Sequence, residues 1–190
     1  MPGSGTTHDN ELQMALRLRQ GDRTALRAVY DTYARYLTAV CARYIADNDD
    51  VKDVLQEAFI RIYDAAGSFE YRGSGSLKGW LTRIVVNQAL KHLRDNKALF
   101  VPLSPQQEDI AEEDADTEQI PAEVIHKMIR ELPDGYRAVF NLYILEQRSH
   151  KEIAALLGIS ESTSASQLHR AKALLAFKIN KYRTAQNSAS

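Results

Sequence analysis

Apolar residues recur every three or four positions along most of this chain, the spacing that places them on one face of an α-helix. No segment shows the strict alternation of apolar and polar residues that marks a strand. The pattern predicts a short helix ending before Gly21, long helices over 26–44, 49–67 and 77–95, and shorter helices starting near Pro121 and Asp134. We therefore predict an all-α protein.

An acidic, proline-containing stretch divides the helical pattern into two parts. Residues 98–121 hold three prolines and seven carboxylates but no lysine or arginine, a composition that disfavours a packed core. We predict two small helical domains joined by a flexible acidic linker. The expected segments are a disordered N-terminus at 1–9, a first domain at 10–97, the linker at 98–121, a second domain at 122–183 and a disordered tail at 184–190.

Residues 149–172 have the pattern of a helix-turn-helix. Ser149 and Glu152 fit a capping box at the start of a short helix, and Gly158 offers the permissive backbone needed at its end. Ser160 fits the N-cap of a second helix. The polar residues expected on the exposed face of that helix suit base edges and phosphates, and they are Ser162, Thr163, Ser166, Gln167 and Arg170.

The charge of the C-terminal stretch favours DNA as the ligand of this motif. No acidic residue follows Glu161, whereas several lysines and arginines do, and such a basic stretch is typical of phosphate binding. The same pattern also fits a helical hairpin with a solvated cationic face. The motif alone therefore leaves both interpretations open.

Composition excludes several other classes of protein. The net charge is −1, so any contact with nucleic acid must come from local clusters of positive charge. The single cysteine, Cys41, cannot form an internal disulfide. In an apolar stripe, Cys41 is expected to be a small buried hydrophobic residue. No apolar run is long enough for a membrane span, and the first ten residues do not resemble a signal peptide. We expect a soluble, cytoplasmic protein without membrane insertion.

Catalytic chemistry has no clear signature in the chain. The five histidines are scattered without zinc-site spacing, and neither a phosphate-binding glycine loop nor a nucleophile elbow is present. We expect no catalytic residues, no metal site and no cofactor.

Several ordered motifs resemble one family of transcription proteins. These are DVLQE at 53–57, FEYR at 69–72, GWLTRIVVN at 79–87, and the pair Leu132-Pro133 followed by the helix-turn-helix. In order and spacing they are similar to bacterial RNA polymerase sigma factors of the sigma-70 family, most closely the extracytoplasmic-function (ECF) subfamily. The resemblance extends from about Asn10 to Tyr182.

The resemblance assigns core RNA polymerase binding to the helix over 49–67. Asp53, Gln56 and Glu57 match family residues that bind the clamp coiled coil of the largest polymerase subunit, and Ile60 and Arg61 share their face of the helix. A polar face with one exposed aliphatic residue is itself typical of a docking surface, and an ordinary solvated face is the alternative.

Recognition of the minus-ten element is expected around the glycine and serine loop after the third helix. Aromatic and cationic side chains there, which suit an extruded base, are Phe69, Tyr71, Arg72, Lys78 and Trp80. For Phe69 and Trp80, packing in the hydrophobic core is the alternative. On the following helix, the resemblance places Asn87, Lys91 and Arg94 near the same element.

The second helix of the helix-turn-helix is expected to contact the minus-thirty-five element, but it departs from the family pattern. Ser162, Ser164, Ala165 and Gln167 stand where many members carry glycine, valine, lysine and arginine, which weakens the usual grip on phosphates. Ser164 falls where an apolar packing residue is expected.

The linker has two interpretations. Fully extended, it spans at most roughly 80 Å, enough to separate two DNA-bound domains. Its carboxylates are either simply solvated or, as the resemblance implies, follow a basic polymerase channel.

The leading hypothesis is a sigma factor that binds core RNA polymerase, directs it to promoters and helps melt them, without catalysis of its own. The resemblance implies core RNA polymerase, promoter DNA and an anti-sigma factor as partners. The alternatives are a free-standing helix-turn-helix regulator and a helical interaction scaffold that does not bind DNA, and an enzyme is the weakest candidate.

Overall fold

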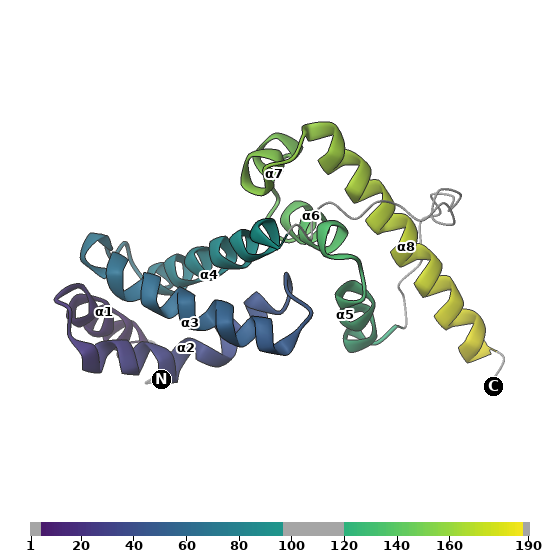
Figure 1. The fold of residues 1–190 in the computed structure, drawn as a ribbon. Coiled ribbons are helices and arrows are strands. Elements are labelled where there is room, and N and C mark those ends of the chain that lie inside the picture. Colours follow the sequence, from purple (N-terminus) through teal and green to yellow (C-terminus); the bar gives the residue numbers. More distant parts are fainter. Residues whose placement is uncertain (1–4, 97–119, 188–190) are drawn as a thin grey trace. The chain divides into compact units, whose positions relative to one another are not determined.

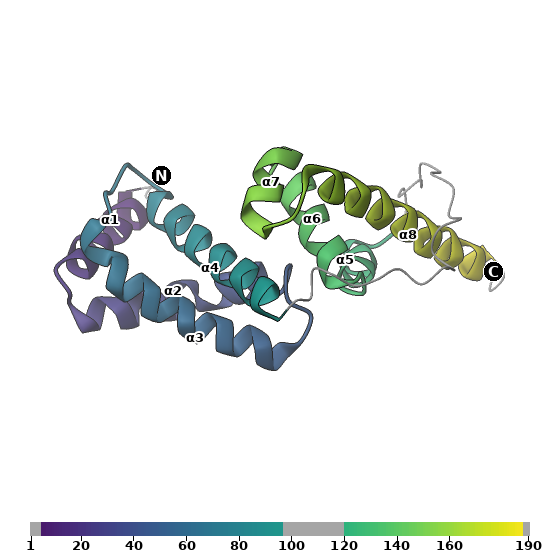
Figure 2. The same ribbon diagram turned by 45° about the horizontal axis from the view of Figure 1, so that its top comes forward.

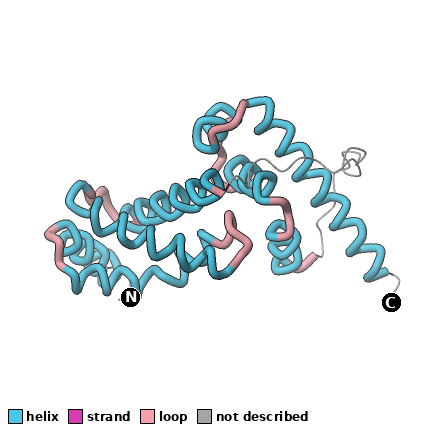
Figure 3. The backbone as a smooth tube through the Cα atoms, in the orientation of Figure 1, coloured by secondary structure: helices cyan, strands magenta, loops and turns pink. Residues whose placement is uncertain are grey.

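The computed structural model describes residues 5–96 and 120–187, and all regular elements in these residues are helical (Figure 1). Figure 3 shows helices and loops in this part of the chain, and no strand. The predicted all-α class is confirmed. The elements are α1 (Gly5–Arg19), α2 (Arg23–Cys41), α3 (Asn48–Ala65), the 3₁₀ turn η1 (Ala66–Ser68), α4 (Ser76–Asp95), α5 (Ala122–Arg130), α6 (Asp134–Ile144), α7 (His150–Leu157) and α8 (Glu161–Asn187).

The ends of the helical part differ from the sequence prediction, and the linker is largely beyond what the structure describes. Helix α1 begins at Gly5, inside the segment expected to be disordered, and α8 continues to Asn187, inside the expected disordered tail. Neither extension contains a proline, and the one glycine, Gly5, stands at the very start of α1, where it does not interrupt the helix. Residues 98–119 of the predicted linker lie outside the described residues.

The structure divides into two compact units. The first contains Met1–Ala42 and Asp47–Ala89, and the second contains Arg43–Ala46 and Leu90–Ser190. Helices α1, α2 and α3 and most of α4 therefore belong to the first unit, and α5 to α8 belong to the second. Figure 2 shows the first four helices gathered in one bundle.

The first unit buries one apolar stripe from each of its helices. Helix α1 packs on α2, and α2 packs on α3. Cys41 at the end of α2 is fully buried, and this burial raises the pKa of its thiol to about 12. The prediction of a small buried residue at Cys41 is confirmed. Other fully buried side chains of this unit are Leu18, Val29, Leu37, Ile62 and Leu81.

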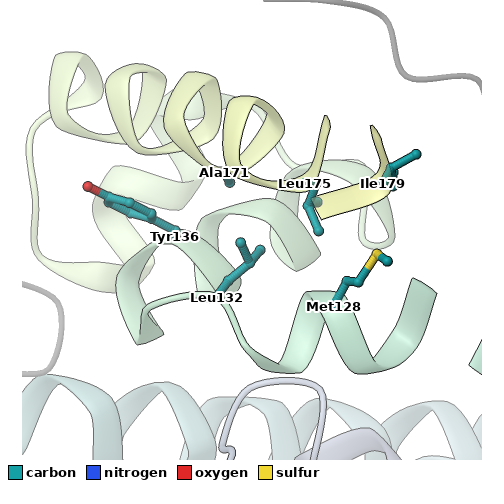
Figure 4. Close-up of a cluster of buried hydrophobic side chains, with 6 residues drawn as sticks. All are labelled: Met128, Leu132, Tyr136, Ala171, Leu175 and Ile179. Carbon is teal, nitrogen blue, oxygen red and sulfur yellow. The ribbon is translucent and has the colours of Figure 1, made fainter. Parts of the chain in front are cut away.

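The second unit is built around α8, against which α5, α6 and α7 pack. Figure 4 shows its cluster of buried side chains, which combines residues before, within and after α6: Met128, Leu132, Tyr136, Ala171, Leu175 and Ile179. The turn between α5 and α6 is fixed by Arg137, whose guanidinium donates to the carbonyl oxygens of Arg130 (3.0 Å) and Leu132 (2.8 Å). This core packs the middle of α8, through Ala171, Leu175 and Ile179, against the residues of α5 and α6.

Two further findings concern the described residues as a whole. None of their helices combines the length and apolar character needed to cross a bilayer. No three His, Cys, Asp or Glu side chains among them come close enough together to hold a metal ion.

Candidate nucleic-acid interface

The first helix of the helix-turn-helix has the caps that the sequence predicts. The Ser149 hydroxyl accepts from the backbone N–H of Glu152, and the Glu152 carboxylate accepts from the N–H of Ser149 at 2.9 Å, which completes the capping box. These hydrogen bonds lower the pKa of Glu152. At the other end, Gly158 adopts the left-handed conformation (φ 68°, ψ 35°) that glycine tolerates best.

The second helix starts on a cap made of hydroxyl groups. Ser160 Oγ accepts from the backbone N–H of Thr163 at 3.0 Å, so its predicted capping role is confirmed. The same oxygen lies 2.7 Å from Thr163 Oγ1 and 2.9 Å from Ser162 Oγ. These three hydroxyls therefore form one hydrogen-bonded group at the N-terminus of α8, where the helix dipole favours an anion such as phosphate.

A polar contact holds the two helices of the motif together. Ser164 is fully buried, and its Oγ lies 2.9 Å from Nδ1 of His150 on the first turn of α7. The His150 ring stacks on Tyr143 of α6, with ring centroids 4.9 Å apart. The serine that replaces an expected apolar residue is thus paired, because a histidine from the facing helix supplies its partner. Nothing in the sequence pattern indicated this pair.

The candidate DNA contacts on α8 are not equally accessible. Ser162 and Ser166 are exposed, and Thr163 and Arg170 are half-buried. Gln167 is only 7 % exposed, so the expectation that its side chain lies on the open face is wrong. Gln167 follows Ser164 by three residues and therefore shares its inner side of the helix.

The glycine and serine loop between η1 and α4 borders a hollow of about 550 Å³. Phe69 and Trp80 line it with their ring centroids 4.9 Å apart, and Arg72 and Arg83 line it with guanidinium groups. Phe69 is only 6 % exposed and thus belongs mainly to the hydrophobic core, whereas Trp80 is half-buried. The sequence reading missed Arg83, which could have been found because it follows Trp80 by three residues on the same helical face.

Other residues of this loop are held by local contacts. The Arg72 guanidinium pairs with the Glu70 carboxylate at 3.1 Å. Lys78 Nζ lies 4.1 Å from the centre of the Tyr36 ring, a cation–π contact. Tyr71 is half-buried beside the same loop.

Three candidate residues on α4 share an exposed face. Asn87, Lys91 and Arg94 are all exposed, and their spacing of four and three residues places them in one row along the helix. Lys91 Nζ lies 3.7 Å from the Asp95 carboxylate, an exposed ion pair that costs little to exchange for a phosphate.

The exposed face of α3 lies beside an apolar groove. Asp53, Gln56 and Glu57 are exposed, and Ile60 on the same face has 62 % of its surface open to solvent. Between α2 and α3 lies a groove of about 780 Å³, lined by Tyr30, Leu55, Gln56, Phe59 and Ile60 among others. An aliphatic side chain this exposed beside a polar face is typical of a protein docking surface.

A capped helix-turn-helix in one helical unit, and an aromatic hollow with arginines in another, define a DNA-binding protein with two recognition parts. Comparisons with known proteins give the family. The model of Sigma-70 region 2 matches residues 29–99, and the model of Sigma-70 region 4 matches residues 122–175.

Curated relatives match over most of their length. The ECF RNA polymerase sigma factor SigM of Mycobacterium tuberculosis (strain Erdman) is 31% identical over 156 residues, covering 82% of this chain and 78% of the relative. The RNA polymerase sigma-H factor of Pseudomonas aeruginosa is 28% identical over 185 residues, covering 87% of this chain and 92% of the relative. A solved structure of CnrH in complex with the cytosolic domain of CnrY is 19% identical with a TM-score of 0.45, covering 88% of this chain and 96% of that one.

The chain belongs to the ECF group of the sigma-70 family of RNA polymerase sigma factors. It is a transcription initiation factor that binds core RNA polymerase and promoter DNA and directs the polymerase to promoters. Family membership sets aside the free-standing regulator and the interaction scaffold, because neither accounts for the region 2 match.

Proposed function

We propose that three surfaces divide the work of promoter recognition. The start of α8 reads the minus-thirty-five duplex, the hollow and the exposed row on α4 hold the separated minus-ten strand, and the exposed face of α3 binds core RNA polymerase. The observation that carries the proposal is the capped helix-turn-helix, with Ser164 buried and its neighbours Ser162 and Ser166 exposed.

Contact with the minus-thirty-five element centres on Ser162, Thr163, Ser166 and Arg170. The hydroxyl groups at the N-terminus of α8 suit a phosphate, and the Arg170 guanidinium, which lies two to three turns along the helix, suits a guanine edge or a second phosphate. Gln167 contributes to DNA binding in this proposal only through the small part of its side chain that reaches the surface.

Arg170→Ala should weaken binding of holoenzyme to promoter DNA by about 1 to 3 kcal/mol, or about 5- to 150-fold, because a good base or phosphate contact is lost. The measurement is the equilibrium affinity for duplex DNA at fixed salt. Lys181→Ala is the control, since it removes one positive charge from the same helix three turns further on. A loss below roughly 0.5 kcal/mol, or an equal loss in the control, would show that Arg170 has no specific role.

Contact with the minus-ten element depends on the hollow beside Trp80. Arg72 and Arg83 line the hollow together with the aromatic pair of Phe69 and Trp80, a combination of residue types that suits single-stranded bases and backbone phosphates. Phe69 supports the wall from the hydrophobic core, while Tyr71 and Lys78 flank it. The row formed by Asn87, Lys91 and Arg94 continues along the exposed face of α4 and would meet the neighbouring nucleotides.

Asn87→Ala should slow promoter opening at least about fivefold, since an exposed amide that pairs with a base edge contributes roughly 1 kcal/mol or more. The measurement is the rate of open-complex formation, followed by reactivity of unpaired thymines. Affinity for core RNA polymerase should stay unchanged because Asn87 does not lie on the α3 face. A joint loss of opening and of polymerase binding would point to misfolding and would contradict the assigned role.

One further partner and one further contact with the polymerase are suggested by family membership alone. We infer that an anti-sigma protein sequesters this chain, and that the acidic segment between the two units follows a basic channel of the polymerase. Both interactions would take place in the cytoplasm, where RNA polymerase acts. Co-purification of a tagged full-length chain with a membrane-anchored or soluble inhibitor, displaced by core RNA polymerase, would support the first inference.

A further inference from the structure

We propose that Glu11 of α1 is a positioning residue that fixes the glycine and serine loop and thereby shapes the hollow for the separated DNA strand. The proposal rests on the function proposed above for that hollow. Glu11 precedes the residues matched by the region 2 model, which begin at 29, and the sequence pattern gave α1 no role beyond packing.

The contacts of Glu11 reach across more than sixty residues of sequence. Its Oε2 accepts from the backbone N–H of Gly75 at 2.8 Å, and its Oε1 accepts from the N–H of Leu77 at 2.9 Å. The side chain is 9 % exposed. Each carboxylate oxygen therefore holds a different amide, one in the loop and one in the first turn of α4 (Ser76–Asp95).

A buried carboxylate is well suited to this position. The first N–H groups of a helix have no partner within the helix, and the helix dipole favours a negative charge there. Hydrogen bonds to an ionised acceptor are also stronger than those between neutral groups. The Glu11 carboxylate thus supplies the Leu77 amide with the partner that the first turn of α4 lacks, and it holds the Gly75 amide of the loop at the same time.

The loop has a backbone hydrogen bond of its own, from the Ser76 N–H to the Gly73 carbonyl (3.1 Å), and Glu11 adds a restraint on the two amides that flank Ser76. Gly73 (φ 111°) and Gly75 (φ 83°) both lie in the region that only glycine enters readily. Ser76, between the two amides bound by Glu11, accepts at its Oγ from the N–H of Arg72 at 3.2 Å. Fixing Gly75 and Leu77 therefore also fixes Ser76, and through it the backbone of Arg72 at the hollow.

Tyr33 of α2 lies near both Glu11 and the loop residue Tyr71. The pKa of Tyr33 is raised, first by burial and then by the nearby Glu11 and Tyr71. Tyr33 is thus near enough to both Glu11 and Tyr71 for each of them to act on its ionisation. This grouping agrees with α1 acting as the support of the loop.

The test compares Glu11→Gln with Glu11→Asp and with Glu123→Gln, an exposed glutamate on α5 (Ala122–Arg130) that serves as the control. Glutamine keeps the size of the side chain, but its NH₂ group faces an amide donor, so one of the two hydrogen bonds is lost. Aspartate keeps the charge but is one methylene shorter and cannot span both amides.

Both Glu11 variants should open promoter DNA at least about fivefold more slowly than the unmodified chain, since a charged hydrogen bond is removed or weakened. Hydrogen exchange of the full chain should be faster in peptides covering 69–80 and unchanged in those covering 29–65. Affinity for core RNA polymerase should remain within about twofold, and Glu123→Gln should match the unmodified chain in every assay.

Three outcomes would overturn the proposal. The first is that Glu11→Gln changes neither the rate of promoter opening nor hydrogen exchange. The second is faster hydrogen exchange throughout the first unit with an equal loss of polymerase binding, which would indicate a purely structural role. In the third, exchange of 69–80 rises but opening does not change. If Asn87→Ala slows opening in that case, only the positioning role fails, whereas if it does not, the function proposed for the hollow fails as well.

Discussion

Glu57→Lys is expected to abolish assembly of this sigma factor with core RNA polymerase at the concentrations where the unmodified chain assembles. Glu57 lies on the exposed face of α3 beside Gln56, which also lines the apolar groove between α2 and α3. Reversing a charge at the centre of a protein interface costs about 2 to 5 kcal/mol, so affinity should fall at least roughly 30-fold. The measurement is the equilibrium dissociation constant for core RNA polymerase.

A matched control exists on the neighbouring helix. Asp31 of α2 is 56 % exposed in an ion pair with Arg27, and Asp31→Lys changes the net charge by the same amount. Because an exposed ion pair contributes little, this variant should bind polymerase nearly as well as the unmodified chain. Equal affinities of Glu57→Lys and the unmodified chain would remove the assignment of Asp53, Gln56 and Glu57 to the polymerase contact.

Local signals were sufficient to predict most of the fold. The capping box of Ser149 and Glu152, the left-handed Gly158 and the Ser160 cap each depend on residues within three or four positions of one another, so the sequence shows them directly. Helical periodicity likewise predicted the all-α class. The extra turns at the two ends of the chain were missed because polar residues can continue a helix without leaving an apolar stripe.

Three features that the sequence did not reveal depend on contacts between residues far apart in the chain or on different helices. Nothing near Glu11 indicates that its carboxylate holds the amides of Gly75 and Leu77. The pairing of Ser164 with His150 likewise requires the angle between two helices. Burial of Gln167 follows from that same packing, which residue type alone does not predict.

The pair of Ser164 and His150 has a consequence for DNA binding. A polar residue at this position would leave an unsatisfied hydroxyl and loosen the second helix if the facing helix offered no partner. With His150 in place, the helix-turn-helix keeps its internal contact although the usual apolar residue is missing. The departure from the family pattern therefore concerns the surface that meets DNA more than the packing beneath it.

Leu132→Ala should selectively unfold the second unit. Leu132 is 2 % exposed at the turn before α6 and packs in the cluster with Met128, Tyr136 and Leu175 (Figure 4). Replacing a buried leucine by alanine costs about 2 to 5 kcal/mol because transfer energy is lost and a cavity remains. A small domain has little stability in reserve, so the variant should lose minus-thirty-five binding through unfolding, with its DNA-contact residues unchanged.

Leu145→Ala is the control for Leu132→Ala. It removes the same atoms from a leucine that follows α6 directly but is 52 % exposed. The control substitution should lower the free energy of unfolding by no more than about 0.5 kcal/mol. Hydrogen exchange should show faster exchange of α5 to α8 in Leu132→Ala alone. Fluorescence of Trp80, the single tryptophan of the chain, reports on the first unit and should not change in either variant. The contrary result is that Leu132→Ala changes the Trp80 fluorescence and speeds hydrogen exchange in α2 to α4 as well as in α5 to α8. The two units would then unfold as one. The independent stability that separate promoter contacts require would be disproved.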